Sequence, residues 1–146
     1  MKILVINGPN LNMLEQRKPS IYGRLTLSEI NKELEKISGI LGISLIFFQS
    51  NHEGQLIDFI QRHFRSADGI LLNPGALTHY GYSLRDCLKD CMLPVAEVHL
   101  SDLNSREGFR KVDVLDGVVK LKISALKEKS YYLGLKKLVS LIKRQK

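Results

Sequence analysis

The sequence predicts an α/β protein built on a doubly wound, five-stranded parallel sheet with helices on both faces. Short apolar runs alternate with segments of helical periodicity, which is typical of strands joined by crossover helices. The chain has 146 residues, 44% of them hydrophobic, which is enough for one domain with a substantial core. No repeat, low-complexity segment or linker interrupts the sequence, so we expect one flavodoxin-like domain over residues 1–146.

The first fifty residues are expected to form a strand, a long loop, a helix and a second strand. Lys2–Asn7 is an apolar run typical of a buried strand, and residues 8–25, punctuated by proline and glycine, indicate a lid loop. Thr26-Leu27-Ser28-Glu29 is a capping box, and it opens a helix that Gly42 ends. Ser44–Phe48 is expected to be the second strand.

The remaining elements continue this alternation to the end of the chain. Helices are expected from about Glu53, over Tyr82–Lys89 and over Tyr131–Ile142. Strands are expected at Ile70–Leu72, Val95–Leu100 and Val118–Ile123. Lysines alternate with apolar residues in the last of these strands, which is the pattern of a sheet edge. Right-handed crossovers would bring the loops that follow the strands to one edge of the sheet.

The formal net charge of +7 is unevenly distributed. From Lys120 onward the chain has nine Lys or Arg residues against one acid, Glu128, whereas the rest carries 13 basic and 14 acidic residues. We interpret the basic segment as the solvated face of the C-terminal helix. A domain that binds nucleic acid through this helix remains an alternative, although no basic stripe interleaved with aromatic residues supports it.

Neither a membrane span nor a disulfide is expected. The sequence has no run of roughly 18 apolar residues, and the N-terminus enters a strand without the pattern of a signal peptide, so we expect a cytoplasmic protein. Cys87 and Cys91 would share one face of a helix, and a metal site would need further ligands beside them. We expect them to be reduced, partly buried helix residues.

Four polar clusters come directly after predicted strands. They occupy residues 7–12, 49–54, 73–79 and 97–101. In an open parallel sheet the ligand crevice lies outside the carboxyl ends of the strands. Asparagine, glutamate and histidine recur at this one topological position, so the clusters predict a single active site.

Several kinds of site are excluded by these clusters. The first loop has neither the Gly-x-Gly-x-x-Gly pattern nor the Walker A spacing, which argues against a nucleotide site. A phosphorylated receiver domain would need an aspartate after the third strand, where this chain has Asn73. The sequence also has no serine elbow and no cysteine nucleophile with a clear base partner.

Acid–base chemistry is the reaction type that the clusters favour. Tyr22 shares the lid with Arg17 and Arg24, and a nearby cation would lower its pKa and make a phenolate base. The alternative is a tyrosine that packs on its own loop. His99 follows Glu97 by two residues, so both side chains leave one face of the strand and the carboxylate could orient a general acid. A structural histidine remains open at this position.

Five motifs also occur in a fixed order along the chain. They are Gly8-Pro9-Asn10-Leu11-Asn12, Arg17-Lys18-Pro19-Ser20-Ile21-Tyr22-Gly23, Gln49-Ser50-Asn51-His52-Glu53-Gly54, Asn73-Pro74-Gly75-Ala76 with Thr78-His79, and Glu97-Val98-His99-Leu100-Ser101 followed by Arg106-Glu107 and Phe109-Arg110. In sequence and spacing they closely resemble the type II 3-dehydroquinate dehydratases. The resemblance implies a flavodoxin-like fold, a dodecamer of trimers, and reversible dehydration of 3-dehydroquinate through an enolate, without metal or cofactor.

The resemblance also implies a role for each matching residue. Tyr22 would be the base, assisted by Arg17, and His99 the acid, oriented by Glu97. Asn10 would stabilise the enolate. The hydroxyls and carboxylate of the substrate would be held by Asn73, His79, Arg110 and the backbone amides of Leu100 and Ser101. Asp86 matches an aspartate that reaches across a subunit interface.

This chain departs from the family pattern mainly in its last third. Lys111-Val112-Asp113 replaces a motif that ends in serine, Asn104 replaces a frequent histidine or tyrosine, and Ala125-Leu126-Lys127 replaces a glycine-rich turn. A binding module of the same fold that has lost turnover is therefore an alternative function. Schiff-base chemistry is not expected, because the polar clusters after the strands contain no lysine.

Overall fold

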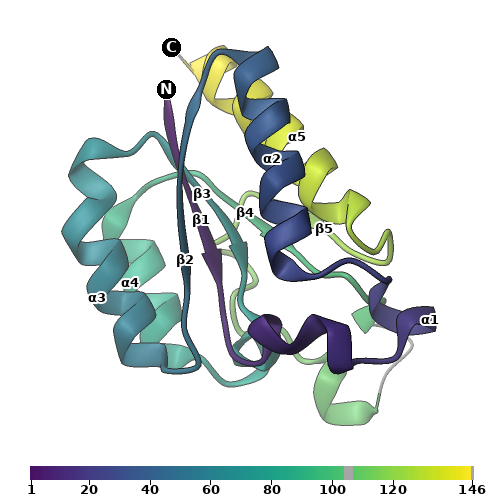
Figure 1. Ribbon diagram of the computed structural model, residues 1–146. Coiled ribbons are helices and arrows are strands. Elements are labelled where there is room, and N and C mark those ends of the chain that lie inside the picture. The colour runs from purple at the N-terminus through teal and green to yellow at the C-terminus, as the bar shows by residue number, and fades with distance from the viewer. Residues whose placement is uncertain (104–106, 146) are drawn as a thin grey trace.

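A computed structural model describes residues 1–103 and 107–145 of the chain, and its centre is a five-stranded parallel sheet (Figure 1). The strands lie in the order β2-β1-β3-β4-β5, and every neighbouring pair is parallel. Their bounds are β1 (Lys2–Asn7), β2 (Ser44–Gln49), β3 (Gly69–Asn73), β4 (Val95–Val98) and β5 (Leu121–Ile123). This order confirms the predicted doubly wound fold, with β5 at an edge.

Two helical layers cover the sheet, and each closes its own hydrophobic core. The helices α2 (Leu27–Leu41) and α5 (Lys129–Gln145) lie on one face, and α3 (Glu53–His63) and α4 (Tyr82–Cys91) lie on the other (Figure 1). Alternate residues of β1 serve the two cores, with Val5 facing α2 and α5 and Leu4 facing α3 and α4. A strand that is buried on both faces explains the continuous apolar run of the sequence.

The predicted capping box fixes the start of α2. The Thr26 hydroxyl accepts a hydrogen bond from the Glu29 amide, and the Thr26 amide donates to the Glu29 carboxylate. This backbone hydrogen bond, followed by that of the Thr26 hydroxyl, lowers the pKa of Glu29 from its ordinary value. Gly42 ends the helix at φ 67°, a left-handed conformation that glycine adopts at little cost.

The lid differs from the expected loop, because residues 8–25 contain two short helices. The 3₁₀ helix η1 (Leu11–Gln16) buries Leu11 and Leu14 in the core beneath α2, and α1 (Pro19–Tyr22) is a single turn with proline at its first position. Segments of four to six residues are too short to reveal a helical period in the sequence. The lid is therefore anchored by two leucines and is not loop throughout.

The ends of the last two strands were also predicted incorrectly. β4 stops at Val98, and β5 begins at Leu121 instead of Val118. Val118 and Val119 pack against the core under α3 and α4. Their apolar character reflects this packing of a turn and not pairing with β4. The remaining short elements are the 3₁₀ helices η2 (Phe64–Ser66), η3 (Gly75–His79) and η5 (Gly108–Lys111).

The cysteines and the basic C-terminal segment lie as the sequence indicates. Cys87 is buried, Cys91 is half-buried, and both are free. Burial raises the pKa of Cys87 to about 12, which makes its thiol inert at neutral pH. The basic side chains of α5 are exposed while its apolar side chains face the sheet. Within the described residues, no helix is long and apolar enough to cross a membrane, and no group of three or more candidate side chains could hold a metal.

Candidate active site

A cleft lies at the carboxyl ends of β1, β3 and β4, and the lid covers it. In Figure 1 the lid helix α1 lies at this end of the sheet. Nine of the predicted site residues line the cleft: Asn10, Arg17, Tyr22, Asn73, His79, His99, Leu100, Ser101 and Arg110. They come from four separate stretches of the chain. The structure thus brings together the side chains that the strand ends and the lid motif indicated.

Two glycines allow the loops after β1 and β3 to meet at the floor of the cleft. The Gly8 amide donates to the Asn73 carbonyl over 2.8 Å, and a Cβ at Gly8 would lie 2.3 Å from the Pro74 carbonyl oxygen. Gly75 has φ 59°, and a Cβ there would lie 2.9 Å from the Pro9 carbonyl oxygen. Side chains at these positions would push the two loops apart, so the cleft requires both glycines.

The lid contributes a phenol and a guanidinium in direct contact. The guanidinium carbon of Arg17 lies 4.3 Å from the centroid of the Tyr22 ring. Gly23, at φ 87°, ends the turn directly after the tyrosine. Both side chains are half-buried and line the cleft. A guanidinium at this distance is attracted to the face of the aromatic ring, so the contact holds the two side chains together.

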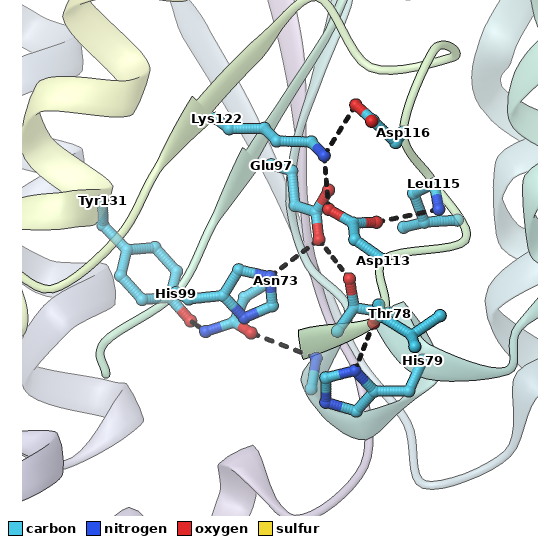
Figure 2. A network of polar contacts seen from close by, with 12 residues as sticks. Asn73, Thr78, His79, Glu97, His99, Asp113, Leu115, Asp116, Lys122 and Tyr131 are labelled. Atoms are coloured by element: carbon cyan, nitrogen blue, oxygen red, sulfur yellow. Dashed lines mark hydrogen bonds and ion pairs between the residues drawn. The ribbon is translucent and has the colours of Figure 1, made fainter. Parts of the chain in front are cut away.

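The inner wall of the cleft holds a buried histidine–carboxylate pair, and Figure 2 shows its surroundings. Nε2 of His99 lies 2.7 Å from Oε1 of Glu97, and the Thr78 hydroxyl donates to the same oxygen over 2.6 Å. Glu97 and Thr78 are completely buried, and His99 is 8% exposed. A carboxylate only accepts hydrogen bonds, so Nε2 carries a proton and Nδ1 remains for a ligand in the cleft. The predicted orientation of His99 by Glu97 thus has a geometric basis.

A second buried network fixes the floor of the cleft. Asn73 donates through Nδ2 to the Tyr131 hydroxyl over 2.8 Å, and this hydroxyl donates to Oδ1 of Asn7 over 2.6 Å. Oδ1 of Asn73 accepts from the Gly75 amide over 3.1 Å. Burial raises the pKa of Tyr131, so its hydroxyl stays protonated. The sequence marked Tyr131 only as the first residue of the last helix, and no local signal distinguished its hydroxyl.

The rim of the cleft also carries His79 and Arg110. Nδ1 of His79 lies 2.6 Å from the Val112 carbonyl oxygen, so this nitrogen donates and Nε2 is left to accept. The Arg110 guanidinium carbon lies 4.9 Å from the Phe109 ring centroid, and Nε forms an ion pair of 2.8 Å with Glu107 that lacks hydrogen-bond geometry. Two motif positions, Asn104 and Arg106, lie outside the described residues.

Two predicted residues do not line the cleft of their own chain: Glu97, which is completely buried and contacts His99, and Asp86. Asp86 lies exposed on α4, and the lining of the cleft does not include it. Its expected role depends on a neighbouring subunit and stays a prediction.

The cleft as a whole is equipped for proton transfer on an anionic ligand. It combines a phenol beside a guanidinium, an imidazole held by a carboxylate, and a second guanidinium at its rim.

Comparison with known proteins identifies relatives with the same organisation. The family model described as dehydroquinase class II matches residues 1–139. A 3-dehydroquinate dehydratase of Roseiflexus castenholzii is 51% identical over 135 residues, which cover 92% of this chain and 86% of that protein. The protein of the same name from Carboxydothermus hydrogenoformans is 50% identical over 145 residues, which cover 99% of this chain and 94% of that protein.

Solved structures support the same relationship. The type II dehydroquinase of Butyrivibrio crossotus superposes with a TM-score of 0.91 at 41% identity, covering 94% of this chain and 97% of that one. The type II dehydroquinase of Propionibacterium acnes superposes with a TM-score of 0.90 at 33% identity, covering 95% and 96%. A periplasmic arabinose-binding protein at 12% identity, with a TM-score of 0.56, shares the fold alone.

Proposed function

Because the chain belongs to the class II dehydroquinase family, we propose that it is a 3-dehydroquinate dehydratase, a hydro-lyase of the shikimate pathway that works through an enolate. The observation that carries this proposal is a single cleft lined both by Tyr22, which contacts Arg17, and by His99, which contacts Glu97. One group is suited to remove a proton and the other to deliver one. The reaction requires both operations on adjacent carbons of the substrate.

Tyr22 is the base in the first step. As a phenolate it removes a proton from C2 of 3-dehydroquinate, and the electrons of the C–H bond move into the adjacent ketone to give an enolate. The Arg17 guanidinium stabilises the phenolate before the transfer. The polar group of Asn10, at the edge of the cleft, assists the enolate oxygen, directly or through water.

His99 is the acid in the second step. As an imidazolium it gives the Nδ1 proton to the C1 hydroxyl, the C1–O bond breaks, and the enolate electrons form the C1–C2 double bond as water leaves. Glu97 keeps the ring oriented and stabilises its charged form. The base in the lid and the acid in the wall support an anti elimination, with the proton and the hydroxyl leaving from opposite faces.

The remaining lining residues bind the polar groups of the substrate. Arg110 supplies a cation for the carboxylate, and His79 offers its free ring nitrogen to a hydroxyl. Asn73 and the backbone amides of Leu100 and Ser101 complete this set. Buried hydrogen bonds hold Asn73 before a ligand arrives, so little ordering is needed on binding.

The described lining of this cleft offers no amine side chain that could form a Schiff base with the substrate. Among the described residues that line it, none is a lysine. We therefore expect borohydride added with 3-dehydroquinate to leave activity intact and to add no substrate mass to the protein. A covalent lysine adduct in the intact mass, accompanied by loss of activity, would contradict the enolate mechanism.

We further propose a homo-oligomer, a dodecamer of trimers, working in the cytoplasm without metal or cofactor. Asp86, exposed on α4, would then contribute to the cleft of a neighbouring subunit. Light scattering should report a large assembly, and Asp86→Ala should lower activity without unfolding the subunit. A fully active monomer would rule out this role for Asp86.

The direct test of the activity is incubation with 3-dehydroquinate, followed at the absorbance of the enone product. We expect turnover by the purified protein alone and after treatment with a chelator. An inert protein that still binds 3-dehydroquinate would instead support the alternative of a binding module. Absence of both turnover and binding would refute the assignment altogether.

A further inference from the structure

A charged cluster lies directly behind the acid of the proposed reaction. Nζ of Lys122, on β5, lies 2.5 Å from Oδ2 of Asp113 and 2.9 Å from Oδ1 of Asp116. Figure 2 shows the lysine reaching over Glu97 toward the two aspartates. Lys122 and Asp113 also line a second cavity that touches His99. We refer to these three side chains as the Lys122 cluster.

The register of the sheet places this cluster beside Glu97. Glu97 on β4 is the direct partner of Lys122 on β5, and paired residues of neighbouring strands project from the same face. Oε1 of Glu97 already accepts from Thr78 and contacts His99. Its second oxygen, Oε2, has no hydrogen-bond partner among the residues that the structure describes, and the side chain is fully buried.

A buried carboxylate with one unsatisfied oxygen is costly unless a cation offsets its charge. Lys122 is the cation on the adjacent strand. Burial by itself lowers the pKa of Lys122, but the hydrogen bonds to Asp113 and Asp116, followed by the charges of Asp113 and Glu97, together raise it above the ordinary value, so the lysine stays charged. The two aspartates hold the ammonium in place and moderate its field.

The same cluster organises the rim of the cleft. Oδ1 of Asp113 accepts from the Leu115 amide over 2.8 Å, which fixes the turn before β5. This turn supplies the Val112 carbonyl that contacts His79 and the Val114 amide that donates to the Thr78 carbonyl over 2.7 Å. The ion pair between Lys122 and Asp113 therefore connects the edge strand β5 to the turn that contacts His79 and Thr78.

We propose that Lys122 is a positioning residue of the dehydratase, which acts through Glu97 and sets how strongly His99 holds the proton that it delivers. The proposal rests on the proposed function, in which His99 is the acid. It also gives a purpose to Asp113, which stands where the family motif ends in serine. A charged residue at this position holds a lysine that a serine could not neutralise.

The charges around His99 come from every element that packs against it. They are Glu97 on β4, Lys122 on β5, Lys111, Asp113 and Asp116 before β5, and Arg17, Tyr22, His79 and Arg110 across the cleft. Removing Lys122 leaves Glu97 and two aspartates without their cation. The charge near His99 becomes more negative, so the imidazolium holds its proton more tightly. Activity falls when the acid loses its proton, and the alkaline limb of the pH profile should therefore move to higher pH.

The first test compares Lys122→Met with Lys122→Arg by steady-state kinetics on 3-dehydroquinate. For Lys122→Met we expect kcat to fall roughly tenfold with little change in KM, since orientation and not substrate contact is altered. The alkaline limb should rise by about half a pH unit or more. Lys122→Arg, which keeps the charge, should restore most of kcat and the profile. Lys120→Met removes an exposed lysine two positions away and serves as the matched control.

The second test uses a variant for which the alkaline limb of the pH profile should move in the opposite direction. Asp116→Asn removes one neutralising carboxylate from Lys122, so the alkaline limb should move to lower pH, by less than the Lys122→Met shift because Asp116 is 79% exposed. This exposed substitution should not disturb folding, which keeps the proposal testable if Lys122→Met fails to fold. A packing role alone would not move the limb in opposite directions.

Failures of the two proposals look different. An inactive wild-type protein refutes the dehydratase and this inference together. An active wild type overturns the role of Lys122 alone if a folded Lys122→Met variant keeps kcat and the pH profile. An unshifted limb in Asp116→Asn, or a control Lys120→Met that behaves like Lys122→Met, overturns it equally.

Discussion

The inner wall of the cleft carries His99, and the lid carries Tyr22. The two regions hold these proposed catalytic groups by opposite structural means. The wall consists of Thr78, Glu97 and His99, each at most 8% exposed and joined by buried hydrogen bonds. The lid, residues 8–25, presents Tyr22 from a single helical turn with exposed residues before it. His99, the proposed acid, is thus preorganised by buried contacts, whereas Tyr22, the proposed base, lies half-buried on a single turn of the lid.

This difference separates stability from catalysis. Buried networks of this kind contribute to folding, so a change in the wall should affect both the free energy of unfolding and the rate. A change in the half-buried lid should affect the rate alone. The predictions below test this contrast, from the largest expected effect to the smallest.

The largest effect is expected from Tyr22→Phe, which removes the ionisable group and keeps the ring against Arg17. We expect kcat to fall by about two to four decades, as loss of a general base commonly costs. The melting temperature should stay within experimental error of the wild type. Steady-state kinetics and calorimetry on the same preparation test both statements, and near-normal kcat would exclude Tyr22 as the base.

Arg17 provides the matched comparison within the lid. Arg17→Ala should also lower kcat strongly, while Arg17→Lys should recover only part, since an ammonium lacks the planar face that lies over the ring. Wild-type activity in both variants would mean that charge and shape at this position are both unimportant.

The second effect concerns the wall. Glu97→Gln keeps the shape of the side chain but removes the charge that stabilises the imidazolium, so kcat should fall by about one to two decades. Unlike Tyr22→Phe, this variant should also melt at a lower temperature, because the bonds from Thr78 and His99 are buried. Unchanged stability would show that the wall contributes no more to folding than the lid.

The third effect belongs to the floor. Tyr131→Phe removes a completely buried hydroxyl and leaves polar atoms of Asn73 and Asn7 without their partner. The free energy of unfolding should fall by about 1–3 kcal/mol, the cost of unsatisfied buried groups. Because Asn73 lines the cleft, KM should rise as well. Urea unfolding and steady-state kinetics measure the two changes, and an unaffected KM would separate Asn73 from substrate binding.

The contrast between wall and lid also explains what the sequence could reveal. The wall residues follow strands with a clear apolar pattern, so their place at one edge of the sheet could be predicted, and so could the spacing that joins His99 to Glu97. The short helices of the lid have too few residues to display a period. The proposed role of Asp86 lies in a second subunit, which no pattern within one chain reveals.

The interactions missed by the sequence join residues that are distant in the chain. Tyr131 reaches Asn7 across 124 positions, and its ring fits an apolar helix face so well that nothing pointed to its hydroxyl. The pairing of Lys122 with Asp113 depends on the turn between them, and alternation had assigned the last part of this turn, residues 118–120, to a strand. Local periodicity reports which face is buried and does not report which polar tips meet there.

The smallest effect is expected where the lid joins α2. Glu29 accepts from the amide and the hydroxyl of Thr26, which holds the pKa of its carboxyl below the ordinary value. A carboxyl whose pKa is lower in the folded than in the unfolded chain stabilises the fold above the unfolded pKa, and this contribution disappears as pH falls through the folded value. Glu29→Gln retains a side chain that can complete a capping box and removes only the charge.

The urea midpoint of the wild type should therefore exceed that of Glu29→Gln at about pH 7, and the difference should disappear as pH falls through the lowered pKa of Glu29. Activity at neutral pH should be equal in both proteins, because Glu29 is exposed and lies outside the cleft. This junction ends the segment that carries Tyr22. A Glu29→Gln variant with lower kcat and an unchanged midpoint would mean that the capping box at the end of the lid positions Tyr22. The buried leucines of η1 would then not suffice to hold it in place.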